Sequence, residues 1–163
     1  MDLEQLREWR NTPELRQYFR EAREITIEMQ EKWFVERANS KNQIDFAIRD
    51  ISSEKLIGHC SLNYISWINR TAEFGVYLGD SSYRHGGYGV EALRLLFEYG
   101  FSDLNLNRIE CEVYSNNAAL DIYHHLGFKN EGIKRQHYFN AGHYWDSHML
   151  GLLQSEWEAQ KSK

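Results

Sequence analysis

The chain has 163 residues, of which 42% are hydrophobic and 14% aromatic, and it carries a net charge of −5. This length suits one domain, predicted over residues 1–163, and the acidic balance disfavours nucleic acid as a partner, because proteins that bind it usually carry a basic face. The apolar runs fall short of the roughly 20 residues that span a membrane, and the charged start MDLEQLREWRN does not resemble a secretory signal, so the sequence predicts a cytoplasmic protein without a membrane partner.

The first third of the chain is predicted to be helical. Apolar residues recur at helical spacing over residues 3–9. Thr12 and Pro13 predict the start of a second helix, because threonine caps helices well and proline suits the first helical position. Thr26 is predicted to cap a third helix.

Three strands are predicted next, over residues 44–50, 56–65 and 72–78. The gaps between them are too short for crossover helices, so these strands are predicted to be antiparallel. Cys60 in the second strand and Cys111 further along both stand in apolar runs. We predict that both are buried free thiols rather than a disulfide.

The pattern then returns to a helical period. A helix is predicted over residues 89–101, a strand over 108–114, and a short helix over about 117–125 that ends at Gly127.

Two strands are predicted to close the fold, over residues 128–132 and 144–153. A polar segment is expected to join them, and the tail after Trp157 is expected to fray. The order of elements predicts an α+β (mixed α/β) fold, in which helices pack on a central mixed, mostly antiparallel sheet.

A glycine-rich stretch, RHGGYG over residues 84–89, stands directly before the long helix. A Walker loop is excluded because no Gly-Lys-Ser/Thr follows. Residues 87–92 fit the dinucleotide pattern G-x-G-x-x-A, but the preceding strand ends at Leu78 instead of running into the first glycine, which counts against that interpretation.

Read as R-x-x-G-x-G, the same stretch predicts an anion cradle. Successive backbone N–H groups at a helix start, without a Cβ in the way, bind phosphate well, and Arg84 adds a positive charge. The ligand would be a di- or polyphosphate. A glycine-rich turn beside a solvated arginine is the alternative that the hexapeptide leaves open.

A second motif, N-x-x-A-x-x-I-Y-x-x-x-G-F over residues 116–128, places Asn116 at a strand end and Tyr123 on the next helix. With both motifs in this order, the sequence resembles the GNAT superfamily of N-acetyltransferases, in the branch that includes ribosomal-protein, spermidine and amino-sugar acetyltransferases. The resemblance covers nearly the whole chain. It implies a GNAT-like fold with helices on both faces of a sheet that is splayed at the cofactor site.

The resemblance also implies that acetyl-CoA is the co-substrate. The glycine-rich stretch would hold its pyrophosphate, and backbone groups of the strand over residues 72–78 would pair with the pantetheine arm and the acetyl carbonyl. The residues that the resemblance places at the cofactor are Val76, Tyr77, Leu78, Arg84, His85, Gly86, Gly87, Tyr88, Gly89, Asn116, Ala119 and Tyr123.

One feature departs from the family, which normally opens with a strand before its first helix. This chain starts at the helix, so either the first strand lies upstream of these residues or one edge of the sheet is left bare. A bare sheet edge would invite pairing with another subunit, and a homodimer is the expected form of such pairing.

Two residues are the candidates for catalysis. Tyr123 matches the family's acid, which donates a hydrogen bond to the leaving thiolate; a packed aromatic residue is the alternative. Glu73 is the best candidate base, because alternation puts it on one face with Gly75 and Tyr77, beside the expected acetyl site. Glu110 is a weaker candidate, as is Glu112.

The predicted function is transfer of an acetyl group from acetyl-CoA to a primary amine of a small molecule or a peptide N-terminus, by direct attack on the thioester. The alternative is a non-catalytic acyl-CoA-binding regulator on the same scaffold. No metal is predicted, because the seven histidines lack ligand spacing. The acceptor pocket is expected to involve residues 10–26 and 133–144 and to include Arg16, Tyr18, Arg135, His137, Tyr138 and Trp145.

Overall fold

The computed structural model describes residues 2–161, which fall into two compact units. The first unit holds residues 2–63 and 75–96, and the second holds residues 64–74 and 97–161. The chain passes from one unit to the other within the strands β2 and β3 and the helix α4. That residues 1–163 form a single domain stays a prediction.

The first unit begins with three helices, as the sequence predicts. They are α1 (Asp2–Asn11), α2 (Pro13–Arg16) and α3 (Ile27–Ala38). Three strands follow, β1 (Ile44–Arg49), β2 (Leu56–Ser66) and β3 (Thr71–Leu78). A short 3₁₀ turn, η1 (Ser81–Tyr83), then leads to α4 (Tyr88–Glu98).

The two predicted threonine caps have different outcomes. Thr26 caps α3 as predicted, since its hydroxyl oxygen accepts a hydrogen bond from the Met29 N–H at 3.3 Å. Thr12 takes the N-cap position and Pro13 begins α2, as predicted, but the predicted capping bond does not form, because the Thr12 hydroxyl donates to the Trp9 carbonyl at 2.7 Å and makes no bond to an N–H of α2. The carbonyls that end α1 lie next to Thr12 and compete for its hydroxyl.

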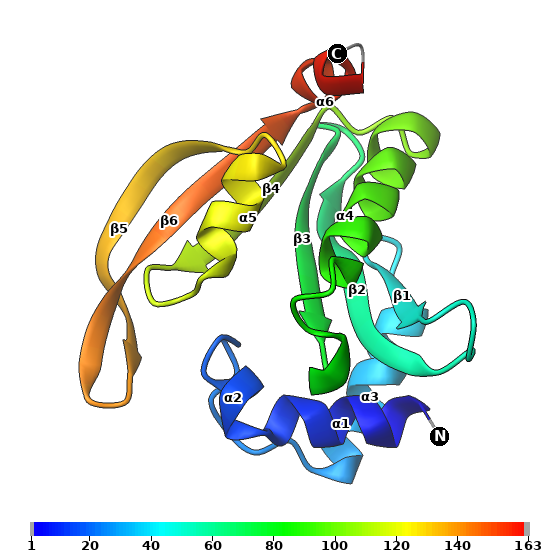
Figure 1. The fold of residues 1–163 in the computed structure, drawn as a ribbon, viewed down its shortest axis with the longest axis vertical. Helices are drawn as coiled ribbons and strands as arrows, with labels where there is room; N and C mark the ends of the chain where they lie inside the picture. Colours follow the sequence, from blue (N-terminus) through cyan, green and yellow to red (C-terminus); the bar gives the residue numbers. More distant parts are fainter. Residues whose placement is uncertain (1, 162–163) are drawn as a thin grey trace. The chain divides into compact units, whose positions relative to one another are not determined.

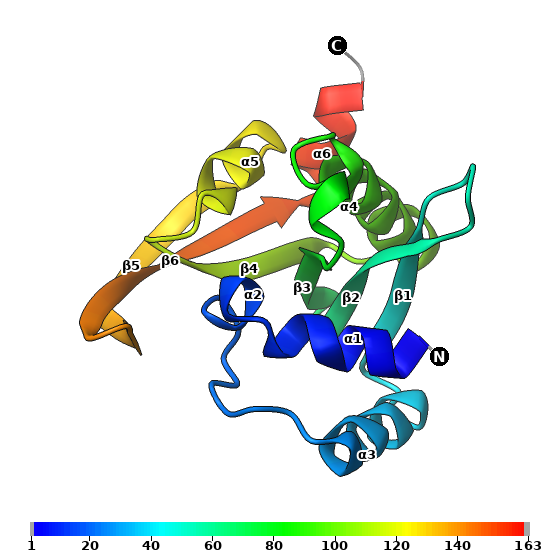
Figure 2. The same ribbon diagram turned by 60° about the horizontal axis from the view of Figure 1, so that its bottom comes forward.

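Helices cover both faces of the strands in the first unit (Figure 2). On one face, Trp33 of α3 lies 6.0 Å from the ring of His59 on β2, which lies 5.6 Å from the ring of Tyr77 on β3. The neighbouring Leu78 points to the opposite face, because side chains alternate along a strand. A Cβ placed on Gly89 of α4 would lie 3.7 Å from the Leu78 side chain, so α4 begins on that opposite face.

The second unit contains the rest of the elements. They are a wide π-type turn, η2 (Tyr99–Asp103), then β4 (Arg108–Tyr114), α5 (Ala119–His125), β5 (Lys129–Asn140), β6 (His143–Leu153) and α6 (Gln154–Lys161). Figure 1 shows β5 and β6 as a long curved hairpin and α5 alongside β4. Gly127 ends α5 in a left-handed conformation, with a φ of +95°, as predicted.

The strands pair in the order β1-β2-β3-β4-β6-β5. The pairs β1–β2, β4–β6 and β5–β6 are antiparallel, whereas β3 and β4 are parallel and join Thr71–Glu73 to Arg108–Glu110. The prediction of a mixed, mostly antiparallel sheet is therefore confirmed.

The final hairpin is longer than predicted. Residues 133–140, expected as a polar connection, belong to β5, which extends to Asn140 and turns at Ala141 and Gly142. This part of β5 does not bury one face, and cross-strand contacts between aromatic side chains stabilise it instead. The ring of Phe139 lies 4.9 Å from the ring of Tyr144 across the hairpin. The register shifts between residues 134 and 138, and this irregularity hides the strand from an alternation pattern.

The frayed tail is also a wrong prediction within the described residues, because α6 continues to Lys161. Glu156 accepts a hydrogen bond from the Leu153 N–H at 3.0 Å and so caps the helix from within its first turn. Trp157 is 4% exposed and packs on Phe97 and Phe101. Residues 162–163 lie outside the described part of the chain.

Candidate active site

The glycine-rich stretch forms the turn between η1 and α4. Gly87 has a φ of +85°, and its carbonyl accepts the first hydrogen bond of α4, from the Glu91 N–H at 3.0 Å. A Cβ on Gly87 would meet no atom within 4 Å, so open space lies in front of this residue. The N–H groups of the first turn of a helix have no acceptor within the helix, and they can therefore bind an anion here.

The other two glycines of the stretch lie close to neighbouring side chains. A Cβ on Gly86 would lie 2.7 Å from the ring of Tyr88, which packs edge-on against Tyr83 at 5.1 Å. Gly89 faces Leu78, and His85 has a φ of +66°. Gly87 is therefore the position at which backbone conformation and open space coincide.

Arg84 fixes the turn to the end of β3. Its Nε donates to the Leu78 carbonyl and its Nη2 to the Gly79 carbonyl, both at 3.2 Å. These two bonds use part of a planar group with five donors, so the positive charge stays beside the turn.

At the end of β3, the backbone groups of alternate residues point toward β2. The Gly79 N–H donates to the Ile57 carbonyl of β2 at 2.9 Å, and the Tyr77 carbonyl oxygen approaches Gly58 so closely that a Cβ there would lie 2.4 Å away. Because backbone groups of successive residues point to opposite edges of a strand, those of Val76 and Leu78 point away from β2. Of the three predicted residues, Val76 is therefore placed to offer its backbone groups to a ligand, and Leu78 is placed to offer its N–H, because its carbonyl accepts the bond from Arg84.

Asn116 and its neighbour occupy the turn from β4 to α5 in the second unit. Asn117 caps this turn, since its Oδ1 accepts a hydrogen bond from the Ala119 N–H at 2.9 Å. The Asn116 Oδ1 is buried and has no hydrogen-bond partner among the described residues. Buried polar atoms without partners are rare, and one at a predicted cofactor residue fits a ligand contact.

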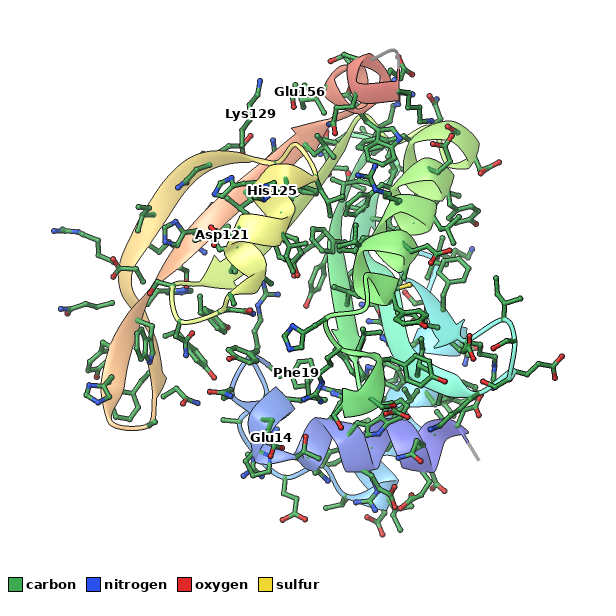
Figure 3. The ribbon with its side chains drawn as sticks, in the orientation of Figure 1. Glu14, Phe19, Asp121, His125, Lys129 and Glu156 are labelled. Carbon is green, nitrogen blue, oxygen red and sulfur yellow. The ribbon has the colours of Figure 1, made fainter. Side chains whose placement is uncertain are left out.

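Tyr123 lies in an aromatic cluster of the second unit. Its ring meets Phe74 edge-on at 5.1 Å and Phe128 at 6.2 Å, and the side chain is 9% exposed. Burial raises the pKa of the Tyr123 phenol, and the nearby Cys111 thiol raises it further. Figure 3 shows Asp121 and His125 on the same helix, and both are exposed. The buried face of α5 thus carries Tyr123.

Glu73, the candidate base, lies on β3 directly across from Glu110 in the parallel pairing. Burial raises the pKa of the Cys111 thiol, and the charges of Glu73 and Glu110 raise it further, so both carboxylates lie near this thiol. Glu110 accepts a hydrogen bond from Arg108 at 2.8 Å, and Glu112 is ion-paired with His137 at 2.7 Å. Glu112 also lies 3.8 Å from the ammonium of Lys134, so each of the two weaker candidates lies beside a lysine or an arginine.

The predicted acceptor residues fall in separate parts of the chain. Arg16 and Tyr18 lie at the end of α2 and just after it. On the hairpin, Tyr138 stacks on Tyr114 at 3.8 Å, and the Trp145 Nε1 is buried without a hydrogen-bond partner among the described residues. Arg135 is exposed.

In the first unit, sequence reasoning did not single out Arg10. It follows Leu6 by four residues on the buried face of α1, and that spacing was the available signal. In the second unit, the pairing of Glu112 with His137 was not predicted, because it joins β4 to the part of β5 that the sequence did not reveal.

Over residues 2–161, no group of three or more His, Cys, Asp and Glu side chains could hold a metal ion. Within the same range, no helix is both long and apolar enough to cross a membrane. Cys60 and Cys111 are buried free cysteines, as predicted.

The fold and the two motifs define an acyl-CoA-dependent transferase. Residues 1–149 match the Acetyltransferase (GNAT) domain, and the chain belongs to this family. The predictions of the GNAT fold, of N-acetyl transfer and of acetyl-CoA as co-substrate are thereby confirmed at the level of the family.

Two relatives show how far the sequence likeness extends. The chain is 35% identical over 113 residues to the uncharacterized N-acetyltransferase p20 of Bacillus licheniformis, a match that covers 69% of this chain and 63% of p20. It is 30% identical over 113 residues to the spermidine N(1)-acetyltransferase of Vibrio cholerae, covering 69% of this chain and 64% of that protein. The matched part thus spans less than two thirds of either relative.

A solved structure extends the likeness to nearly the whole chain. The crystal structure of spermidine N-acetyltransferase from Vibrio cholerae in complex with CoA and spermine has a TM-score of 0.89 at 26% identity. The match covers 96% of this chain and 92% of that one.

Proposed function

We propose that this chain transfers the acetyl group of acetyl-CoA directly to a primary amine, without an acetyl-enzyme intermediate. Gly87 carries the proposal, because its positive φ, the open space before it and the start of α4 coincide. The diphosphate of acetyl-CoA would accept hydrogen bonds from the first N–H groups of α4, near the charge of Arg84.

The other predicted residues receive roles along the same cofactor. The backbone groups of Val76 and Leu78 that point away from β2 would pair with the pantetheine arm and the acetyl carbonyl. The buried Oδ1 of Asn116 would accept a donor of the cofactor, and Ala119 would contact it at the start of α5. Tyr123 would donate a hydrogen bond to the leaving thiolate.

A neutral amine is the second requirement of the reaction. At pH 7 a lysine-like amine is neutral only about one time in 2,500, which costs about 4.6 kcal/mol, whereas an α-amino group costs about 1 kcal/mol. Attack on the thioester carbonyl forms the C–N bond, the C–S bond then breaks, and the amine proton must leave. We assign that proton to the Glu73 carboxylate, directly or through a water.

The Glu73→Gln variant tests this role. We expect kcat to fall by about 100-fold, because general base catalysis contributes that much or more. The acidic limb of the kcat/KM pH profile should also move, since that limb reports the ionisation of the essential base.

Glu110→Gln is the matched control, because Glu110 lies across from Glu73 in the pairing of β3 with β4 and is hydrogen-bonded to Arg108. Its kcat and pH profile should stay close to those of the wild type. A Glu73→Gln enzyme with an unmoved profile would place the base elsewhere.

The acceptor is an amine of a small molecule or a peptide N-terminus, in a protein that we place in the cytoplasm. Spermidine is the acceptor that the names of two relatives state.

We further propose a homodimer formed through β1, which ends the strand order and carries the exposed Phe46. Light scattering should then give a mass twice the 19.4 kDa of the chain, and a mass of one chain would exclude the dimer.

Two measurements test the function itself. Calorimetry should detect acetyl-CoA binding, and an assay for free thiol should detect CoA release when amines of different classes are added. Binding of acetyl-CoA with no thiol release on any amine would contradict the proposed transfer and favour a regulator.

A further inference from the structure

Arg10 on α1 holds a positive charge for which the described residues provide no ion pair. Its guanidinium carbon lies 5.2 Å above the ring of Phe19, a residue labelled in Figure 3. Burial lowers the pKa of the Arg10 guanidinium. Arginine stays charged in proteins, so Arg10 is a partly buried cation that lacks a counter-ion.

A second arginine of the same unit, Arg37, has hydrogen-bond partners for its guanidinium group. Arg37 binds the Asp45 carboxylate with two hydrogen bonds of 2.6 Å, and its Nη2 donates a third bond of 2.6 Å to Asn63. The fold can therefore provide a bidentate carboxylate to a partly buried arginine, and at Arg10 it does not.

The charged groups around Arg10 do not replace that carboxylate. Glu21 is close enough to interact electrostatically with Arg10, but its two oxygens hold Arg23 at 2.9 and 2.7 Å. Arg37 adds repulsion, and Tyr77 is a neutral phenol whose pKa burial raises. The position favours an incoming anion.

A second unsatisfied polar group lies on α3, the helix that packs on α1. Gln30 is 3% exposed, and neither its Oε1 nor its Nε2 has a hydrogen-bond partner among residues 2–161. It shares a helix face with Trp33 and Arg37, which point to the Tyr77 face of the strands. An amide can serve a polar ligand both as donor and as acceptor.

Tyr77 links this region to the proposed chemistry. Its ring lies 5.3 Å from Phe19, whose other neighbour is Arg10, and its backbone lies between the Val76 and Leu78 groups assigned to the cofactor. Alternation along β3 puts the Tyr77 side chain on the same face as Gly75. An acceptor on this face would meet Arg10.

We infer that Arg10 binds an anionic group of the acceptor, so that the substrate is an amine carrying a carboxylate or a phosphate rather than a polyamine. This inference rests on the proposed function. A bidentate bond from guanidinium to either anion would supply the partner that Arg10 lacks. A polyamine would instead bring like charge to Arg10.

The test compares acceptors in matched pairs that differ by the anion. One arm uses alanine and alaninamide, and the other uses glucosamine 6-phosphate and glucosamine, with spermidine as a further acceptor. For each pair we take the ratio of kcat/KM for the acidic to the neutral member, in the wild type and in Arg10→Met. Dividing the two ratios cancels the different basicity of the amines.

We expect the ratio to fall at least tenfold in Arg10→Met for one of the two pairs, and that pair identifies the anion. Arg10→Lys should recover part of the loss. Arg7→Met is the control, because Arg7 lies one turn earlier on α1 and is already paired with Glu4 at 2.5 Å; its ratios should match the wild type. Unchanged ratios in both arms, or spermidine as the best acceptor, would overturn the inference.

A binding measurement keeps this result separate from the proposed function. The thermal shift of the CoA-bound protein is measured with N-acetylalanine, N-acetylglucosamine 6-phosphate and their neutral counterparts. A shift by one acidic compound alone that disappears in Arg10→Met supports the anion site even if no amine is acetylated. Equal shifts by acidic and neutral compounds, or an acidic preference that survives in Arg10→Met, contradict it.

Discussion

Replacing Tyr123 by phenylalanine should lower kcat about 100-fold while the KM for acetyl-CoA stays within about threefold. The variant removes one hydroxyl and keeps the ring that packs on Phe74 and Phe128. Because the Tyr123 hydroxyl makes no hydrogen bond to the described residues, the melting temperature should not fall. Steady-state kinetics and a thermal melt measure the three quantities.

The physical reason lies in the proton of the phenol. Transfer of a proton from an ordinary phenol to a thiolate is uphill by about 2 kcal/mol. Burial raises the pKa of Tyr123, so full transfer is still less favourable before the cofactor binds. Tyr123 should therefore act as a hydrogen-bond donor whose bond strengthens as the C–S bond breaks, which affects kcat and not binding.

The raised pKa also has a consequence for the pH profile. The phenol of Tyr123 stays protonated between about pH 7 and 9, because even an unperturbed phenol loses its proton near pH 10. A basic limb of the wild-type profile in that interval should therefore persist in Tyr123→Phe. Tyr64→Phe, the same change at an exposed position of the second unit, should leave kcat unchanged. A Tyr123→Phe enzyme with wild-type kcat would show that the residue serves packing alone.

The helices and strands that bury one face were predictable from the sequence. Thr26 caps α3 and Gly127 ends α5 because these residue types suit those backbone conformations. The strand over 108–114 was found at its full length, since its apolar residues alternate.

The elements that the sequence analysis missed either bury few side chains or are held in the fold by a single buried residue. The outer half of β5 is exposed on most of its length, so its sequence shows no alternation, and its pairing with β6 is visible only once the two strands are opposed. The helix α6 is held by Trp157 alone among its buried residues. A single anchor in a polar segment does not produce a periodic signal.

The candidate site divides in the same way. The glycine-rich stretch and Tyr123 could be predicted from sequence motifs. The lack of an ion pair at Arg10 could not, because it depends on which side chains the fold places near that residue. The sequence shows Arg37 and Arg10 as similar charged residues of helices, and only the structure distinguishes the one that holds Asp45. Burial of a charge is a property of tertiary packing.

Replacing Gly87 by valine should raise the Kd for acetyl-CoA at least tenfold. The positive φ of Gly87 costs a non-glycine residue about 1–2 kcal/mol, and a β-branched residue fits it worst. The new side chain would also enter the open space before the first turn of α4, where the diphosphate is expected. Calorimetry with acetyl-CoA measures the loss.

Gly142→Val is a matched control, because Gly142 also has a positive φ, of +81°, and open space around its Cβ position. It lies in the β5–β6 turn, so a loss of stability common to both variants reports strain, and a loss of affinity confined to Gly87→Val reports the cofactor.

Acetyl-pantetheine, which lacks the diphosphate, separates the two effects further. The wild type should prefer acetyl-CoA to this truncated donor in kcat/KM, and Gly87→Val should lose most of that preference, because the contact it disturbs is absent from the truncated donor. If Gly87→Val kept the full preference, the phosphates would be bound at another place, and the assignment of residues 84–89 would fail even though the family still transfers acetyl groups.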